Sequence, residues 1–249
     1  SYTRAGEFKL NADNFVVNSQ GGHLLGFPVN PDGSSASVSL STAQPIRIPT
    51  ASGAPQSTSE VDIRMNLPAG DPIIAPAIAF DPSDPLTFNH STSITIFDSL
   101  GDSHIMTYYF RKTAANEWSM YSGVDGILVD IPGGVGTLTP PPTAGSTGPS
   151  VSAAQLTFSS GGDFISRIPA LPGDIQTETL NANILTNGSD TTQDVIIDFN
   201  LDPSGPNPNE PTQFASNFEV TALDQNGLAV GRLTGLDIDA DGLVRATYS

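Results

Sequence analysis

The segment Asp237–Gly242 is the stretch whose residue types most resemble a metal site. Its aspartates alternate at Asp237, Asp239 and Asp241, and a glycine follows, as in the first half of a calcium-binding EF-hand loop. That loop also needs a bidentate carboxylate at its twelfth position, where this chain has Tyr248, and it needs flanking helices. The pattern favours a tight hairpin turn, with weak adventitious calcium binding as the alternative.

The three histidines form no metal-binding or catalytic motif. His23, His90 and His104 stand in neither a His-x-x-x-His nor a His-x-Glu pattern, so no zinc site is indicated. The Gly-x-Ser-x-Gly string of a nucleophile elbow is absent. A hydrolase triad assembled around His104 from distant residues is kept as a minor alternative, because such triads need no fixed spacing.

Paired carboxylates are numerous, but they fall where turns are expected. Asp81 with Asp84, and Asp98 with Asp102, are placed to accept hydrogen bonds from the local backbone rather than to face each other across a glycosidase cleft. The glycines of 133–136 lack the lysine of a phosphate-binding loop. These patterns therefore indicate no cofactor site and no metal site.

Two further features have a functional and a plainer interpretation. Asn89–Ser91 and Asn187–Ser189 fit the glycosylation sequon, which arises often by chance in a chain this rich in Asn and Ser. A row of aromatic residues between 108 and 121 could line a sugar-binding face, but such residues more often form sheet core. The row consists of Tyr108, Tyr109, Phe110, Trp118 and Tyr121.

Charge and cysteine content narrow the class of partner. The 26 acidic and 9 basic residues give a formal charge of -17, which argues against nucleic acid and against an anionic membrane surface. The absence of cysteine excludes disulfides, Cys-ligated zinc, iron–sulfur clusters and a thiol nucleophile. No apolar run approaches the ~18–20 residues of a membrane span.

Short strand-like segments separated by turn signals predict an all-β protein of sandwich or barrel type. The 24 glycines and 21 prolines disfavour long helices. Strands are predicted at 2–10, 15–17, 23–29, 45–49, 61–67, 93–97, 104–111, 118–121, 155–158, 180–185, 195–201, 218–222 and 243–248.

The segment 93–121 predicts a β-meander whose middle strand carries bulky residues on both faces. We therefore expect that strand to be covered on both sides or to lie at an interface. The Gly/Pro/Thr/Ser-rich segment 132–150 predicts a flexible surface loop or a disordered insertion, and 49–58 predicts a linker at a domain boundary.

Three stretches together resemble the bacterial flagellar hook protein family. The first is 2–10 followed by Gly22–Pro28, where Phe27 replaces the Tyr usual in the family. The second, which is sharper, is Thr95–His104 with Tyr109–Thr113 and Asn116–Trp118. The third is 231–244; the middle of the chain, about 124–215, carries no such motif.

The resemblance implies two β-rich domains, with the outer inserted into the inner. An inner, D1-like domain would comprise 1–52 and 228–249, and an outer, D2-like domain 53–227. The family's terminal helical regions would be missing, so the chain is expected to be a fragment and a monomer in dilute solution.

The function implied is structural, so the resemblance predicts a protein that is not an enzyme and has no catalytic residues. The chain would be part of a subunit that assembles with copies of itself into the hook, the flexible helical tube that transmits motor torque to the filament. Other implied partners are the rod, hook cap and hook–filament junction proteins. The implied location is extracellular, reached through the flagellar secretion system without a cleaved signal peptide. The alternatives are a distal rod-type axial protein and a secreted carbohydrate-binding β-sandwich.

Overall fold

The computed structural model describes residues 8–27, 39–48, 51–138, 146–148, 150–170, 175–199, 210–238 and 244–248. The chain divides into two compact units. Unit 1 comprises Ser1–Ala54 and Val230–Ser249, and unit 2 comprises Pro55–Ala229. The two boundaries between these units lie two residues after the domain boundaries expected from the sequence, 52/53 and 227/228.

The described residues are almost entirely β or irregular structure, which confirms the all-β fold class. The helical element among them is the 3-10 turn Leu40–Thr42. Within this part of the chain, no helix has the length and apolar content needed to cross a bilayer.

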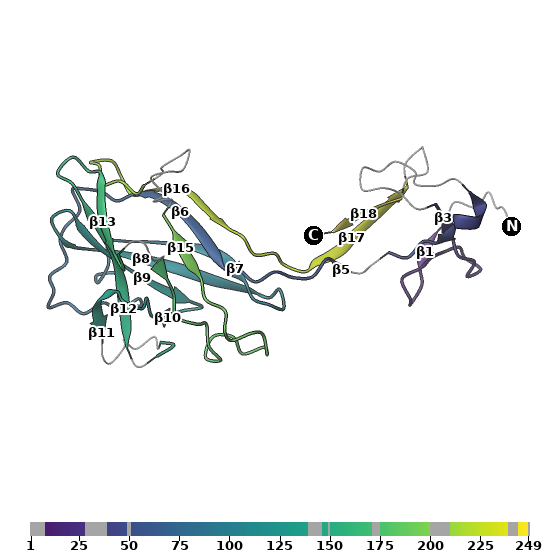
Figure 1. The fold of residues 1–249 in the computed structure, drawn as a ribbon, viewed down its shortest axis with the longest axis horizontal. Coiled ribbons are helices and arrows are strands. Elements are labelled where there is room, and N and C mark those ends of the chain that lie inside the picture. Colours follow the sequence, from purple (N-terminus) through teal and green to yellow (C-terminus); the bar gives the residue numbers. More distant parts are fainter. Residues whose placement is uncertain are drawn as a thin grey trace. The chain divides into compact units, whose positions relative to one another are not determined.

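Unit 1 is built from short antiparallel ladders. Its strands are β1 (Lys9–Leu10), β2 (Val16–Val17), β3 (Leu25–Gly26), β4 (Gln44–Pro45), β5 (Ala51–Ser52), β17 (Gly231–Ile238) and β18 (Val244–Tyr248). Strand β1 pairs with β2, β3 pairs with β4, and the third sheet has the order β18-β17-β5 (Figure 1).

A polar turn joins β1 to β2, as predicted. The Asn11 side-chain oxygen accepts the backbone N–H groups of Asp13 and Phe15 at 3.0 and 2.9 Å. Asn14 has a φ of 66°, a left-handed conformation that asparagine adopts more readily than most residues. Farther along, Gly26 meets a requirement for a small residue, because a Cβ there would lie 2.8 Å from Cδ1 of Ile46.

Unit 2 contains a seven-stranded sheet with the main order β11-β12-β9-β8-β7. Strand β10 also pairs with β9, and β13 pairs with β12 (Figure 1). The strands are β7 (His90–Phe97), β8 (Ser103–Ala114), β9 (Glu117–Val124), β10 (Ile127–Val129), β11 (Val135–Leu138), β12 (Val151–Phe158) and β13 (Phe164–Ile168). The antiparallel run β7-β8-β9 is the predicted meander, and it is confirmed.

A four-stranded sheet completes unit 2, in the order β14-β15-β6-β16. Its strands are β6 (Glu60–Asn66), β14 (Ile175–Gln176), β15 (Ile196–Asp198) and β16 (Glu219–Gln225). The pairing of β15 with β6 is parallel, and the other two pairings are antiparallel.

The main core of unit 2 lies between these two sheets. Val61, Ile63 and Met65 of β6 belong to the same buried cluster as Met106, Tyr108 and Phe110 of β8. Alternation along β6 places these apolar side chains inward and the intervening polar ones outward. This burial of apolar surface is the main stabilising contribution to unit 2.

Strand β8 is covered on both faces over its second half, which confirms the prediction made from the bulky residues on both of its faces. A second buried cluster lies on the face opposite the main core and contains Phe80, Tyr121 and Leu128, with Phe88 and Tyr109 packed against it. The rings of Phe80 and Tyr121 stack with centroids 4.1 Å apart.

The predicted strand 180–185 is wrong. Leu185 donates its backbone N–H to the Asn181 carbonyl at 3.0 Å, and the Asn181 side chain accepts the N–H of Asn183, so the chain makes a turn. Leu180, Ile184 and Leu185 are nevertheless buried. Their apolar spacing reflects burial from a turn, which a strand pattern imitates over so short a segment.

The predicted loop 132–150 is wrong over 135–138, which form β11. Gly134 allows this strand to approach β12, because a Cβ at Gly134 would overlap the carbonyl oxygen of Ala153. Gly136 adopts a φ of 62° within the strand and brings its carbonyl to the hydroxyl of Tyr121. The segment 139–145 and residue 149 lie outside the described residues.

Candidate functional site

The turn between β7 and β8, residues 98–102, is a densely hydrogen-bonded polar site of unit 2. Asp98 is fully buried. Its Oδ1 accepts the N–H groups of Leu100 and Asp102, both at 2.9 Å, and its Oδ2 accepts the side-chain amide of Asn187 at 2.6 Å. Burial alone would raise the pKa of Asp98, but the hydrogen bonds that it accepts, led by that from Asn187, together outweigh burial and hold that pKa below its usual value.

His104 completes this site with both of its ring nitrogens facing carboxylates. Nδ1 lies 2.7 Å from Oδ2 of Asp125, and Nε2 lies 3.5 Å from Oδ2 of Asp98. A catalytic triad needs one imidazole nitrogen directed at a nucleophile, while the other contacts the orienting acid. The geometry therefore gives His104 a structural role, joining the turn to residue 125.

Both sequon asparagines are engaged in structural hydrogen bonds. Asn187 donates to Asp98 and, at 2.7 Å, to Asp102. Asn89 accepts the backbone N–H of Lys112 and donates to the carbonyl of Pro72. Modification of either amide would break these contacts, so the structure favours the chance interpretation of both sequons.

Two buried cations hold the segment 69–79 against β8. Arg111 donates to the carbonyl oxygens of Ala75 and Ile78, at 3.0 and 2.6 Å. Lys112 donates to those of Ala69 and Asp71, at 2.5 and 3.2 Å. Burial lowers the pKa of Arg111, with a smaller opposing effect of Tyr121. We call Arg111, Lys112 and these carbonyls the carbonyl clamp.

The aromatic row does not form an exposed platform. Tyr108, Phe110, Trp118 and Tyr121 are buried, and Tyr109 packs against the second cluster. Core was the favoured interpretation of this row, and it is confirmed. The indole N–H of Trp118 donates to the side-chain oxygen of Gln213 at 2.8 Å, so the buried polar end of this ring is satisfied.

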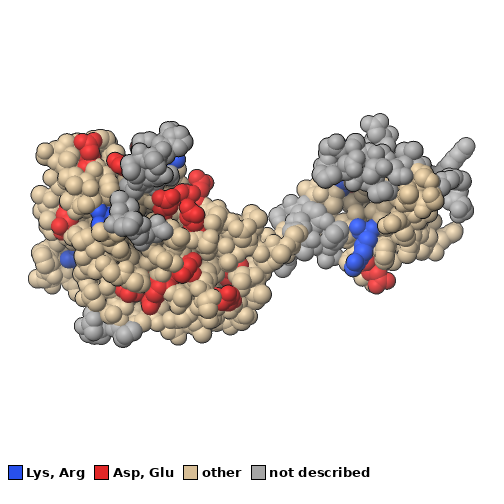
Figure 2. All heavy atoms as spheres, viewed as in Figure 1, with Lys and Arg blue, Asp and Glu red and all other residues tan. Residues whose placement is uncertain are grey.

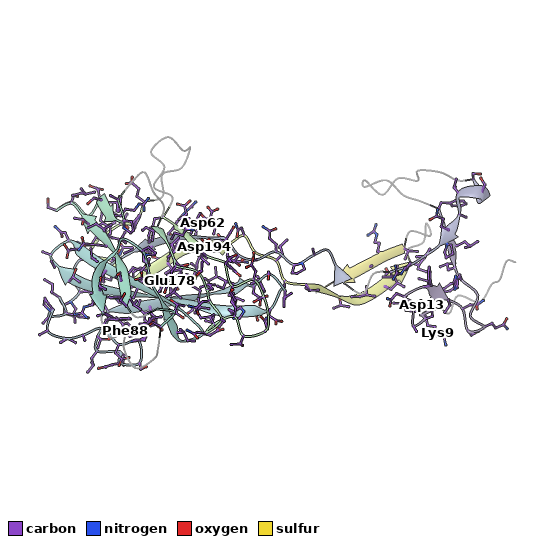
Figure 3. The ribbon with its side chains drawn as sticks, turned by 60° about the horizontal axis from the view of Figure 1, so that its bottom comes forward. Lys9, Asp13, Asp62, Phe88, Glu178 and Asp194 are labelled. Atoms are coloured by element: carbon purple, nitrogen blue, oxygen red, sulfur yellow. The ribbon has the colours of Figure 1, made fainter. Side chains whose placement is uncertain are left out.

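An acidic row crosses the outer face of the four-stranded sheet. In the ladder, Asp62 of β6 is paired with Asp198 of β15 on one side and Asp224 of β16 on the other. Burial, then Asp198 and Asp224, raises the pKa of Asp62, and Arg64 opposes this. Figure 3 labels Asp62 on the upper side of unit 2, and Phe88 on the lower side.

This face contains a cluster of three carboxylates that the sequence analysis did not identify. One carboxylate oxygen from each of Glu60, Asp62 and Asp198 lies within 4.8 Å of the other two. The grouping depends on the parallel pairing of distant strands, for which no local signal exists. At the predicted calcium-like segment, the Asp237 side chain accepts the N–H of Ile238, and 239–243 lie outside the described residues.

Residues 66–228 match the profile of the family described as the flagellar basal body protein FlaE D2 domain. The chain belongs to this family. The matched segment lies within unit 2, which spans Pro55–Ala229. Both the 98–102 turn and the carbonyl clamp lie inside the match.

Relatives called flagellar hook protein FlgE are similar to the chain along its whole length. The protein of Salmonella typhimurium is 29% identical over 248 residues, covering 100% of this chain and 53% of the relative. The protein of Escherichia coli is 29% identical over 252 residues, covering 100% of this chain and 52% of the relative. The chain spans about half the length of the curated relatives it matches.

Among solved structures, the chain is similar to the Helicobacter pylori flagellar hook protein FlgE2. The TM-score is 0.46, with 11% sequence identity, 99% of this chain covered and 78% of the other.

Of the stretches that carried the resemblance, the second contains both the 98–102 turn and the cations of the clamp. From the sequence, Asp98 and His104 were singled out, but Arg111 and Lys112, which build the clamp, were not. Their partners at 69–78 and 187 lie far away in sequence. The sequence did contain one signal for the clamp. Arg111 and Lys112 stand side by side at the end of a largely apolar predicted strand, and cations that become buried there need hydrogen-bond acceptors.

Proposed function

We propose that this chain forms the β-rich part of a flagellar hook subunit, which assembles with copies of itself into the hook. The observation that carries the proposal is the family match over 66–228, supported by hook-protein relatives along the whole chain. The rod, hook cap and hook–filament junction proteins are its proposed further partners. The proposed location is extracellular, after export without a cleaved signal peptide.

Within this proposal, unit 1 corresponds to the inner hook domain and unit 2 to the outer one. Its role is mechanical, so it needs no catalytic residues. The carbonyl clamp and the 98–102 turn support this role, because their hydrogen bonds fix the segment 69–79 and Asn187 to the sheet of unit 2.

A bending tube also needs places where the chain can change conformation. The chain passes between unit 1 and unit 2 twice, and we call the two connecting segments the crossings. Gln56 and Leu228 exchange backbone hydrogen bonds of 3.0 and 2.8 Å, so both residues already belong to the paired structure of unit 2. The crossings are therefore 53–55 and 229–230. Gly53 has a φ of 74°, and a Cβ there would meet nothing within 4 Å. We propose that these crossings act as hinges.

The hinge is tested with Gly53→Val and a matched control, Gly70→Val, at a glycine with equally open surroundings and no positive φ. A β-branched residue at positive φ costs about 1–2 kcal/mol, so we expect Gly53→Val to shift this crossing's conformation. Hook curvature in electron micrographs should change with Gly53→Val only. Identical curvature in both variants would refute the hinge.

The function itself is tested by deleting the gene and imaging the cells by electron microscopy. We expect flagella and hooks to be lost and to return when the full-length gene is restored. Intact hooks in the deletion strain would overturn the proposal.

The alternatives have less support. The relatives matched along the whole chain are called hook proteins rather than distal rod proteins. A carbohydrate-binding sandwich would need exposed aromatic rings, whereas the candidate rings of this chain lie in its core.

A further inference from the structure

An apolar strip, Pro72–Ala79, lies on the surface of unit 2. Its sequence is Pro-Ile-Ile-Ala-Pro-Ala-Ile-Ala, without a charged or hydrogen-bonding side chain. Ile73 is 51% exposed and Ile78 is 45% exposed. Single exposed apolar residues are ordinary, but a continuous exposed apolar segment commonly marks an interaction surface.

The strip is held in one conformation from beneath. The carbonyl clamp bonds Ala75 and Ile78 to Arg111, and Ile74 donates its N–H to the carbonyl of Lys112 at 3.0 Å. Asn89 donates to the carbonyl of Pro72 at 2.9 Å. These contacts use the backbone, so the apolar side chains remain free to face outward. A surface ordered in advance loses less conformational entropy on binding.

Charge selects the occupant of this surface. The strip itself has no charged side chain, and Arg111, which bonds its backbone carbonyls, is buried, so the strip offers no charged group to an acidic or a basic partner. The chain carries a formal charge of -17, and separate acidic groups are visible on unit 2 in Figure 2. Two copies of such a chain repel each other over most of their surface, and an uncharged strip is where they can meet at the lowest electrostatic cost.

We propose that the Pro72–Ala79 strip is a docking surface for a second copy of this chain. The inference rests on the proposed function and adds to it the residues through which neighbouring subunits touch. Growth of an open helical polymer requires a contact between two different surfaces, so the strip meets a surface other than itself on the next copy.

The experiment uses full-length protein in hooks sheared from cells, with single-cysteine variants. The chain contains no cysteine, so Ile73→Cys provides a single labelling site in it. A benzophenone maleimide attached to this cysteine is irradiated in hooks and, as a control, in dilute monomer. We expect a cross-linked dimer in hooks only, with a peptide of this same chain as the partner in mass spectrometry. Absence of an adduct in hooks, or a partner peptide from another protein, would overturn the inference.

A charged residue gives the second readout. Ile73→Asp places a buried carboxylate in the proposed contact, and we expect at least a tenfold loss of hook yield. The matched control is Ile165→Asp, at another exposed isoleucine of unit 2 that is 60% exposed. Equal losses in both variants would assign the effect to added charge in general and overturn the inference.

The two proposals fail in different ways. If the wild-type protein is absent from hooks, the proposed function fails and the inference fails with it. If it forms hooks in which residue 73 yields no adduct and Ile73→Asp assembles normally, the inference alone fails.

Discussion

Replacing Asp98 by alanine should destabilise unit 2 strongly. The substitution removes the acceptor of three hydrogen bonds, from the backbone of Leu100 and Asp102 and from the Asn187 amide, at a fully buried position. An intramolecular hydrogen bond contributes ~0.5–1.5 kcal/mol net to stability. At about 1 kcal/mol each, the three bonds to Asp98 amount to roughly 3 kcal/mol, a large share of the ~5–15 kcal/mol stability of a typical domain.

Urea denaturation followed by tryptophan fluorescence is the appropriate assay. The chain has one tryptophan, Trp118, which is buried in the core of unit 2 and reports on the unit that contains Asp98. With a slope of about 2 kcal/mol per molar urea, a loss of 3 kcal/mol lowers the midpoint by about 1.5 M.

Asp84→Ala is the matched control for this measurement. Asp84 makes the same kind of bond, accepting the N–H of Leu86 at 3.0 Å, but at an exposed turn where water can replace it. We expect the control to lower the midpoint only slightly. A shift for Asp98→Ala no larger than that of Asp84→Ala would refute the reasoning that burial makes the 98–102 turn essential.

Three further predictions follow from the same geometry. Asp98→Asn should flatten the pH dependence of stability at acid pH. The folded-state pKa of Asp98 lies below the ordinary 3.8, so its contribution to stability is complete above pH 3.8 and is lost as pH falls through the folded-state pKa. Urea titrations between about pH 2 and 5 that show the same loss of stability in the variant as in the wild type would contradict this. Asp62→Asn should raise the midpoint at pH 7 by an amount equivalent to about 0.2–1 kcal/mol, because it relieves repulsion from Asp198 and Asp224. Since the pKa of Asp62 is raised, this gain should disappear as pH falls below 3.8, and a gain that persists there would show another cause. Gly134→Ala should displace β11 from β12, because its Cβ would overlap the Ala153 carbonyl; faster hydrogen exchange in 135–138 would show this, and unchanged exchange would exclude it.

The sequence predicted the β architecture well where local signals dominate. The meander 93–121 was predictable because alternating apolar residues flank an Asp/Gly turn, and Asp98 with Gly101 makes that turn in the structure. The bulky residues on both faces of β8 predicted either coverage on both sides or an interface, and the two buried clusters show coverage on both sides.

Features that depend on distant pairing were not predictable. The acidic row exists because β15 pairs in parallel with β6, a register set by the core rather than by the aspartates themselves. The clamp depends on backbone carbonyls at 69–78, and no side chain in the sequence indicates which backbone carbonyls will accept hydrogen bonds from a buried cation. Strand β11 was missed because its glycines, which suggest a loop, are what allow the close approach to β12.

The most direct test of the central claim is to locate this chain in living cells. Ala115, an exposed residue in the turn between β8 and β9, is changed to cysteine in the full-length protein, and cells are stained with an impermeant maleimide dye. The account predicts one short fluorescent segment at the base of each flagellar filament, and none in cells without the added cysteine. Staining along the filament, or over the cell body, would contradict the assignment to the hook.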